Sequence, residues 1–275
     1  MNDKDSLTQV QCFLLDMDGT FYLGEQLLEG ALRFIDVLRE QGREFLFLTN
    51  NSSKDSQQYV EKIARLGLSI PREKVLTSGE ATAMHIQSQK PGARVFVVGT
   101  SALENEFVER GFVLTPEMPD FAVLGFDTTL TYAKLWAFCD LARAGVPYIA
   151  THPDYNCPTE TGFMPDIGAT IAFIKAATGR EPDVIVGKPN QLLVEKAADR
   201  TGVPVSAMCM IGDRLYTDIA LGEATGIPTI LVLSGETQAD EVPLSPYRPS
   251  YIFQNLGAVA DYLSSIGPPR QGRAR

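Results

Sequence analysis

Two aspartates separated by one residue, Asp16 and Asp18, directly follow a short apolar run near the start of the chain. A second acidic pair, Asp213 and Asp218, follows another apolar run in the last third. Asp16 and Asp213 could share a hard divalent cation, and magnesium typically keeps a few protein carboxylates together with water and substrate phosphate. Because such a cation screens the repulsion between a phosphate dianion and a carboxylate, Asp16 could attack phosphorus and form an aspartyl-phosphate.

Further side chains suit the same reaction. Asp18 could protonate the leaving alcohol and then deprotonate the hydrolytic water. Thr49 offers a hydroxyl, and the region of Asn50 and Asn51 offers backbone N–H groups, for the oxygens of the transferring group. Lys188 offers a compact positive charge for that group. Since positioning and electrostatics carry most of the catalysis in phosphoryl transfer, these residue types predict a phosphoryl-transfer site.

Each of these groups follows an apolar run that predicts a strand. The runs are Phe13–Leu15, Phe45–Leu48, Val184–Val186 and Met208–Ile211. In a parallel α/β sheet the carboxyl ends of the strands lie on one edge, where ligands bind. Four strands of one sheet would therefore bring together residues that lie far apart in the sequence.

Helical spacing between these runs predicts an α/β fold with right-handed crossovers. Helices are expected at 28–41, 54–66, 192–201, 218–224 and 255–264, with further strands at 75–76 and 229–233. A middle segment has its own predicted strands (95–98, 121–124, 147–150) and helices (103–110, 132–144, 168–177). We therefore predict a parallel-sheet domain of residues 1–78 and 183–275, interrupted by an inserted α/β domain of residues 79–182. Trp136 lies in an apolar helix pattern and is expected in the core.

Composition excludes several classes of protein. No apolar run approaches the ~20 residues of a membrane-spanning helix. Met1 to Val10 lacks the features of a signal peptide, so a cytoplasmic location without a membrane partner is expected. The net charge of −10 argues against a nucleic-acid polymer as partner. The cysteines are expected to be buried or idle thiols, namely Cys12, Cys139, Cys157 and Cys209.

Four strings in order, DMDGT, LTNN, GKPN and GDRLYTD, resemble the motifs of the haloacid dehalogenase (HAD) superfamily. The resemblance implies a Rossmann-like core in which Asp16 is the nucleophile and Asp18 the general acid and base. It also implies that Mg²⁺ is held by the side chains of Asp16 and Asp213 and by the backbone carbonyl of Asp18. An acidic residue at position 18 is the family's mark of phosphatases and phosphomutases.

The same resemblance implies roles for three more residues. Thr49 would bind phosphate, Lys188 would stabilise its charge, and Asp218 would orient Lys188 or a metal-bound water. The interval from Asp18 to Thr49 holds only one helix and one strand, so the inserted domain lies between Thr49 and Lys188. That placement, with TNNSSK, VVGTSALENEFVERGF and THPD, is similar to subfamily IIA, the NagD-like 4-nitrophenylphosphatases with a type C2 cap.

Two strings in the inserted domain depart from the family pattern. THPD has His152 where asparagine is common, and PDIGA has Asp166 in a normally glycine-rich string. His152, Asp154, Tyr155 and Asp166 are candidates for substrate contact. Hydrogen bonds that stabilise the loops remain an equal alternative for these residues.

The sequence thus predicts a magnesium-dependent phosphatase for small phosphate monoesters. Candidate substrates are sugar phosphates, nucleoside monophosphates, phosphoglycolate, pyridoxal phosphate and 4-nitrophenyl phosphate. A phosphomutase or other phosphotransferase with the same intermediate, and a non-catalytic binding module, are the alternatives. The sequence does not decide whether the chain is a monomer or a homodimer.

Overall fold

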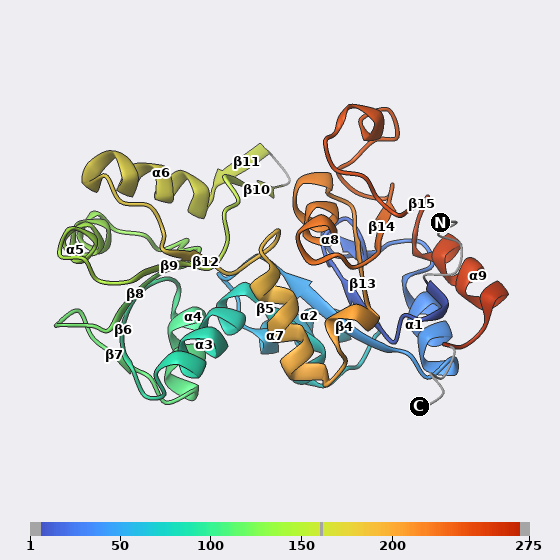
Figure 1. Cartoon of the computed structure of the whole chain (residues 1–275), viewed down its shortest axis with the longest axis horizontal. Helices are drawn as coiled ribbons and strands as arrows, with labels where there is room; N and C mark the ends of the chain where they lie inside the picture. Colours follow the sequence, from blue (N-terminus) through green and yellow to red (C-terminus); the bar gives the residue numbers. More distant parts are fainter. Residues whose placement is uncertain (1–6, 160–161, 270–275) are drawn as a thin grey trace. The chain divides into compact units, whose positions relative to one another are not determined.

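The computed structural model describes residues 7–159 and 162–269 of the chain (Figure 1). Within these residues the chain divides into two compact units. The first unit holds residues 7–48, 60–75 and 197–269, and the second holds the remaining described residues. The predicted inserted domain of residues 79–182 stays a prediction, and each unit is described by itself below.

A six-stranded sheet in the order β15-β14-β13-β1-β4-β5 forms the centre of the first unit. Its strands are β1 (Cys12–Leu15), β4 (Glu44–Thr49), β5 (Val75–Thr77), β13 (Met208–Gly212), β14 (Thr229–Val232) and β15 (Tyr251–Phe253). The pairs that join β1 to β13 and to β4 are parallel, as are β13–β14 and β14–β15. All residues of β1 and β13 are buried, as expected for central strands of a parallel sheet.

Helices α1 (Ala31–Glu40) and α9 (Leu256–Ile266) pack against each other in this unit. The apolar face of α1 is buried, and the chain leaves the helix through Gly42, whose φ is 64°. The other elements are the helix α8 (Ala220–Thr225), the short hairpin of β2 (Tyr22–Leu23) and β3 (Gln26–Leu27), and the turns Arg72–Lys74, Val205–Ala207, Leu215–Ile219 and Val242–Leu244. Two helices cross the boundary between the units, α2 (Ser56–Arg65) and α7 (Gln191–Thr201).

The second unit has its own five-stranded sheet in the order β12-β9-β8-β6-β7. Its strands are β6 (Arg94–Val98), β7 (Val113–Leu114), β8 (Phe121–Leu124), β9 (Tyr148–Ala150) and β12 (Val184–Ile185), with a separate hairpin of β10 (Asn156–Thr159) and β11 (Gly162–Pro165). Its helices are α3 (Ser78–Gln89), α4 (Ser101–Glu109), α5 (Tyr132–Arg143) and α6 (Ile167–Thr178). Helices α5 and α6 lie on one side of this sheet and α3 and α4 on the other (Figure 1).

The α/β class is confirmed, but one strand was predicted in the wrong sheet. Val184 and Ile185 pair in parallel with Ile149 and Ala150 of β9, so β12 extends the second sheet. The apolar run indicates a strand, but it carries no information about the pairing partner. The core position predicted for Trp136 is also wrong, because α5 buries the face that carries Phe138 and leaves Trp136 63% exposed.

The burial predicted for the cysteines holds for three of the four. All four are free thiols, and Cys12, Cys139 and Cys209 are buried. Burial raises the pKa of Cys12 to about 12, so this thiol stays protonated at neutral pH. None of the helices in the described part of the chain has the length and apolar character that crossing a bilayer requires.

Candidate active site

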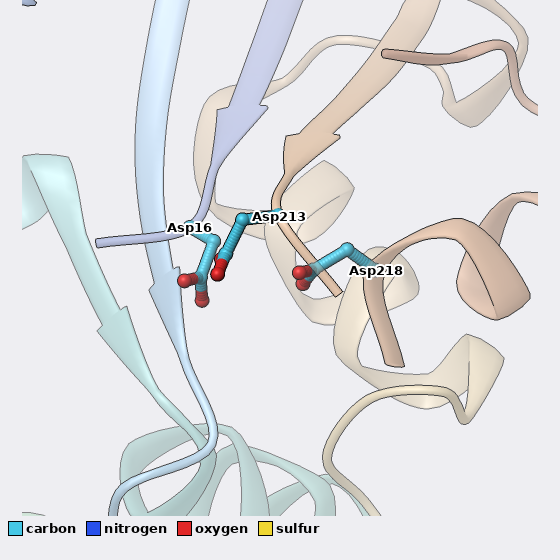
Figure 2. A group of neighbouring side chains, drawn as sticks. All are labelled: Asp16, Asp213 and Asp218. Atoms are coloured by element: carbon cyan, nitrogen blue, oxygen red, sulfur yellow. The ribbon is translucent and has the colours of Figure 1, made fainter. Parts of the chain in front are cut away.

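Three carboxylates converge at the carboxyl edge of the first sheet. Asp16 follows β1, and Asp213 follows β13, the neighbouring strand in which Ile211 pairs with Leu15. Asp218 lies in the helical turn Leu215–Ile219, directly after this strand end. One carboxylate oxygen from each aspartate lies within 4.8 Å of the others (Figure 2). The sequence prediction that Asp16 and Asp213 share one place is therefore met, and Asp218 joins them.

Backbone geometry lets the chain approach this cluster closely. Gly19 has a φ of 85°, and a Cβ atom built on it would lie 2.3 Å from Asp213 Oδ2. Any other residue at this turn would be strained and would collide with the carboxylate. Steric constraints at this site therefore explain why position 19 of the DMDGT string is a glycine.

Hydrogen bonds fix the two carboxylates that follow β13. Thr20 Oγ1 donates to Asp213 Oδ1 at 3.2 Å, and the backbone N–H of Glu236 donates to Asp213 Oδ2 at 2.7 Å. The backbone N–H of Arg214 donates to Asp218 Oδ2 at 3.1 Å. Both aspartates are buried, so these donors replace water around the charges.

The Arg214 side chain supplies positive charge beside the cluster. Its Nε lies 2.9 Å from Glu236 Oε2, an ion pair without the alignment of a hydrogen bond. Burial disfavours the charged guanidinium, but the negative charges of Asp16, Asp213 and Glu236 outweigh it and raise the pKa of Arg214. Arg214 is therefore permanently charged and offsets part of the negative charge of the carboxylates.

The three carboxylates fit a hard divalent cation. They supply only oxygen atoms, lie within 4.8 Å of one another and carry more negative charge than Arg214 alone balances. Asp18 is exposed, forms an isolated β-bridge with Tyr22 and contributes no carboxylate to this group. The resemblance assigned only its backbone carbonyl to the metal, and that assignment stays a prediction.

The residues predicted to bind phosphate belong to the second unit. The backbone N–H of Asn51 donates to Thr49 Oγ1 at 3.1 Å, and Asn51 Oδ1 accepts from the N–H and hydroxyl of Ser53. Asn50 instead bonds both backbone groups of Lys188, with Oδ1 accepting from the N–H at 2.8 Å and Nδ2 donating to the C=O at 3.0 Å. Lys188 is only 3% exposed. The structure thus joins Asn50 to Lys188, a contact that the sequence did not predict.

Three of the four candidates for substrate contact, His152, Asp154 and Asp166, also meet one another in the second unit. His152 is buried, with Nδ1 3.5 Å from Asp154 Oδ2 and Nε2 3.5 Å from Asp166 Oδ1. Burial would raise the pKa of Asp154, but contacts with His152 and Asn50 and the charge of Lys188 hold it below its ordinary value. Tyr155 is 65% exposed. The two departures from the family strings, His152 and Asp166, are therefore neighbours in space.

Sequence reasoning missed Thr20, Arg214 and Glu236 as partners of the carboxylates. Thr20 and Arg214 lie inside strings that were recognised, so their position next to Asp16 and Asp213 was a usable signal. Glu236 contributes a backbone N–H from the loop after β14, and no pattern of side chains in the sequence predicts a backbone donor.

Comparisons with known proteins agree with this geometry. Residues 13–113 match the haloacid dehalogenase-like hydrolase family, and residues 185–259 match a HAD-hydrolase-like family. An acid sugar phosphatase of Staphylococcus aureus is 37% identical over 257 residues, which cover 93% of this chain and 99% of the relative.

Two solved structures extend the comparison to three dimensions. The 4-nitrophenylphosphatase of Thermotoga maritima has a TM-score of 0.91 and 48% identity, covering 93% of this chain and 98% of that one. The glycerol phosphate phosphatase of Mycobacterium tuberculosis, solved in complex with magnesium, has a TM-score of 0.85 and 33% identity, covering 97% and 82%. With the converging carboxylates, these likenesses establish that the chain belongs to the haloacid dehalogenase superfamily, in its NagD-like branch, and is a phosphoric monoester hydrolase.

Proposed function

We propose that the protein hydrolyses small phosphate monoesters in a magnesium-dependent reaction with Asp16 as the nucleophile. The observation that carries the proposal is the convergence of Asp16, Asp213 and Asp218 on one place. Asp16 and Asp213 would hold the cation with the backbone carbonyl of Asp18, and Asp218 would support it. When bound, the cation screens the charge of the phosphate and of the attacking carboxylate.

The chain's own residues carry out two successive displacements. The Asp16 carboxylate attacks phosphorus, the bond from phosphorus to the ester oxygen breaks, and the leaving alkoxide takes a proton from Asp18. Water then attacks the aspartyl-phosphate while Asp18 accepts its proton. Inorganic phosphate leaves, and both carboxyl groups return to their starting states.

Thr49 and Lys188 are proposed to bind the oxygens of the transferring group. The hydroxyl of Thr49 would donate a hydrogen bond, and the ammonium of Lys188 would offset the phosphate charge. The side chains of Asn50 and Asn51 are engaged with Lys188 and Ser53, which favours a supporting role for both asparagines.

The proposed substrates are small phosphorylated metabolites rather than polymers. The relatives are described as acid sugar, 4-nitrophenyl and glycerol phosphate phosphatases, which favours sugar and polyol phosphates. Nucleoside monophosphates, phosphoglycolate and pyridoxal phosphate belong in the same test. The cytoplasm, the expected location, supplies such metabolites.

Phosphate release from a panel of these monoesters in Mg²⁺ tests the proposal. We expect Asp16→Asn to lower turnover at least about a thousandfold, because the amide is a poor nucleophile. Circular dichroism and the unfolding temperature should show that the variant is folded. Chelation of the metal should stop wild-type turnover, and added Mg²⁺ should restore it.

Other results of the same assays would favour one of the two alternative functions. Phosphate transfer only in the presence of a bisphosphate activator would indicate a phosphotransferase. No release from any monoester would favour a binding module, and normal turnover in Asp16→Asn would remove this residue as the nucleophile.

A further inference from the structure

The side chain of Asn50 fixes the backbone of Lys188. Its Oδ1 accepts from the Lys188 N–H at 2.8 Å, and its Nδ2 donates to the Lys188 carbonyl at 3.0 Å. These bonds form only when the amide points its oxygen toward the N–H. A flipped amide would place two donors against each other and leave the Lys188 N–H without its acceptor.

Asp154 selects this orientation of the amide. Its two carboxylate oxygens lie 3.2 and 3.0 Å from Asn50 Nδ2. Because an ionised carboxylate only accepts hydrogen bonds, Nδ2 has to face Asp154 and Oδ1 has to face Lys188. The two hydrogens of Nδ2 then have one acceptor each, Asp154 and the Lys188 carbonyl.

Asp154 is itself held from the other side. The buried His152 packs against Asp154, with its Nδ1 3.5 Å from Asp154 Oδ2 and 3.4 Å from the Asp154 backbone nitrogen. The Asp154 carbonyl accepts from the N–H of Gly168 at 2.8 Å, in the first turn of α6. Asp166, the N-cap residue of α6, lies on the far side of His152. The carboxylate therefore sits at a fixed place.

We propose that Asp154 is a positioning residue for Lys188, acting through the amide of Asn50, and that His152 supports it from behind. Asp154 would then control how well phosphate is bound without touching substrate itself. This inference rests on the proposed function, in which Lys188 binds the phosphoryl group, and it goes beyond that function by assigning residues of the inserted segment to phosphate affinity.

Binding of inorganic phosphate in the presence of Mg²⁺ tests the proposal directly. Losing a hydrogen bond to a charged group is worth about 1.5–3 kcal/mol, so we expect Asp154→Ala to weaken phosphate binding roughly tenfold or more. KM for 4-nitrophenyl phosphate should rise by a similar factor while kcat changes less than about threefold. Asp154→Asn keeps an oxygen that can accept from Nδ2 and should restore most of the affinity.

A matched control is available in the same unit. Asp127 is an aspartate whose side chain is buried against Lys134, 2.6 Å away. Asp127→Ala removes a comparable carboxylate away from the Asn50 network, so it should lower the unfolding temperature without weakening phosphate binding. Equal weakening in both alanine variants would show a general loss of structure and overturn the proposal.

An exchange of the two side chains covers the case in which Asp154→Ala does not fold. Asn50→Asp alone places two carboxylates together and should weaken phosphate binding. Adding Asp154→Asn restores a donor opposite an acceptor between positions 154 and 50 but leaves the Lys188 carbonyl without its donor, so it should recover part of the affinity, at least about threefold. A double variant no better than Asn50→Asp would overturn the proposal.

The outcomes separate this inference from the proposed function. A wild-type protein that neither binds phosphate nor hydrolyses monoesters would defeat the proposed function. Wild-type activity with unchanged phosphate binding in Asp154→Ala would defeat the positioning role alone.

Discussion

At the scale of single residues, two uncharged hydrogen-bond donors hold the Asp213 carboxylate in its orientation. Thr20 contributes a hydroxyl and Glu236 a backbone N–H, one to each carboxylate oxygen. Such partners fix the direction of a metal-binding carboxylate, and their loss typically costs 10–100-fold in metal affinity. The geometry of the cluster therefore rests in part on uncharged donor groups, a hydroxyl and a backbone N–H.

The Thr20 hydroxyl can be removed without changing the shape of the side chain. We expect Thr20→Val to raise the Mg²⁺ concentration that gives half of the thermal stabilisation, by roughly tenfold. Thr225→Val is the control, because that hydroxyl donates to the Leu221 carbonyl within α8. Unchanged Mg²⁺ dependence in Thr20→Val would show that the backbone N–H of Glu236 is sufficient.

The chemistry of the cluster could be predicted from the sequence because its residue types are local and specific. Asp16 and Asp213 each follow a buried run, and neighbouring parallel strands bring such positions together. Asp218 was expected only in support of Lys188 or a water, since sequence spacing does not say where a side chain in a helical turn points. The structure places its carboxylate with the other two.

At the scale of elements, apolar runs located most of the longer strands and helices to within a few residues, but they predicted neither α3 (Ser78–Gln89) nor β15 (Tyr251–Phe253). The strands β2, β3 and β7, two residues each, and the hairpin of β10 and β11 were not predicted, because such short pairs lack a periodic signal. The sheet to which β12 belongs was also beyond the sequence. The pairing of a strand depends on which sheet edge lies beside it in the folded chain. Val184 and Ile185 pair with β9 at the edge of the second sheet.

The start of α6 gives a prediction at this scale. A Cβ atom on Gly168 would lie 2.5 Å from the Pro153 carbonyl oxygen and 3.0 Å from that of Asp154. Gly168→Ala should therefore force the helix away from this backbone and cost roughly 1–3 kcal/mol of unfolding free energy. Urea denaturation of the variant measures the loss.

The exposed residue Ala172 of the same helix provides the control. Ala172→Ser should change the unfolding free energy by less than about 0.5 kcal/mol. A Gly168→Ala midpoint equal to that of the control would mean that α6 is not held closely against Pro153 and Asp154.

At the scale of the whole molecule, the two compact units contain different parts of the proposed chemistry. The acidic cluster lies entirely within the first unit, and the network of Asn50, Asp154 and Lys188 lies entirely within the second. The sequence could predict that a middle segment carries its own strands. It could not define which residues pack with which sheet, because that depends on contacts between residues far apart in the chain.

This separation predicts where a cation stabilises the protein. A ligand at about 100 times its Kd stabilises the folded state by about 2.7 kcal/mol, which corresponds to roughly 5–10 °C in unfolding temperature for units of this size. Because the three carboxylates belong to the first unit, Mg²⁺ should slow hydrogen exchange in peptides from β1 and β13. Peptides from β6 and β8, in the second unit, should exchange at the same rates with and without Mg²⁺.

Asp213→Asn should abolish both the thermal shift and the protection, since it removes a carboxylate charge from the cluster. Protection confined to β6 and β8, or a full thermal shift in Asp213→Asn, would place the cation elsewhere and would separate the acidic cluster from metal binding.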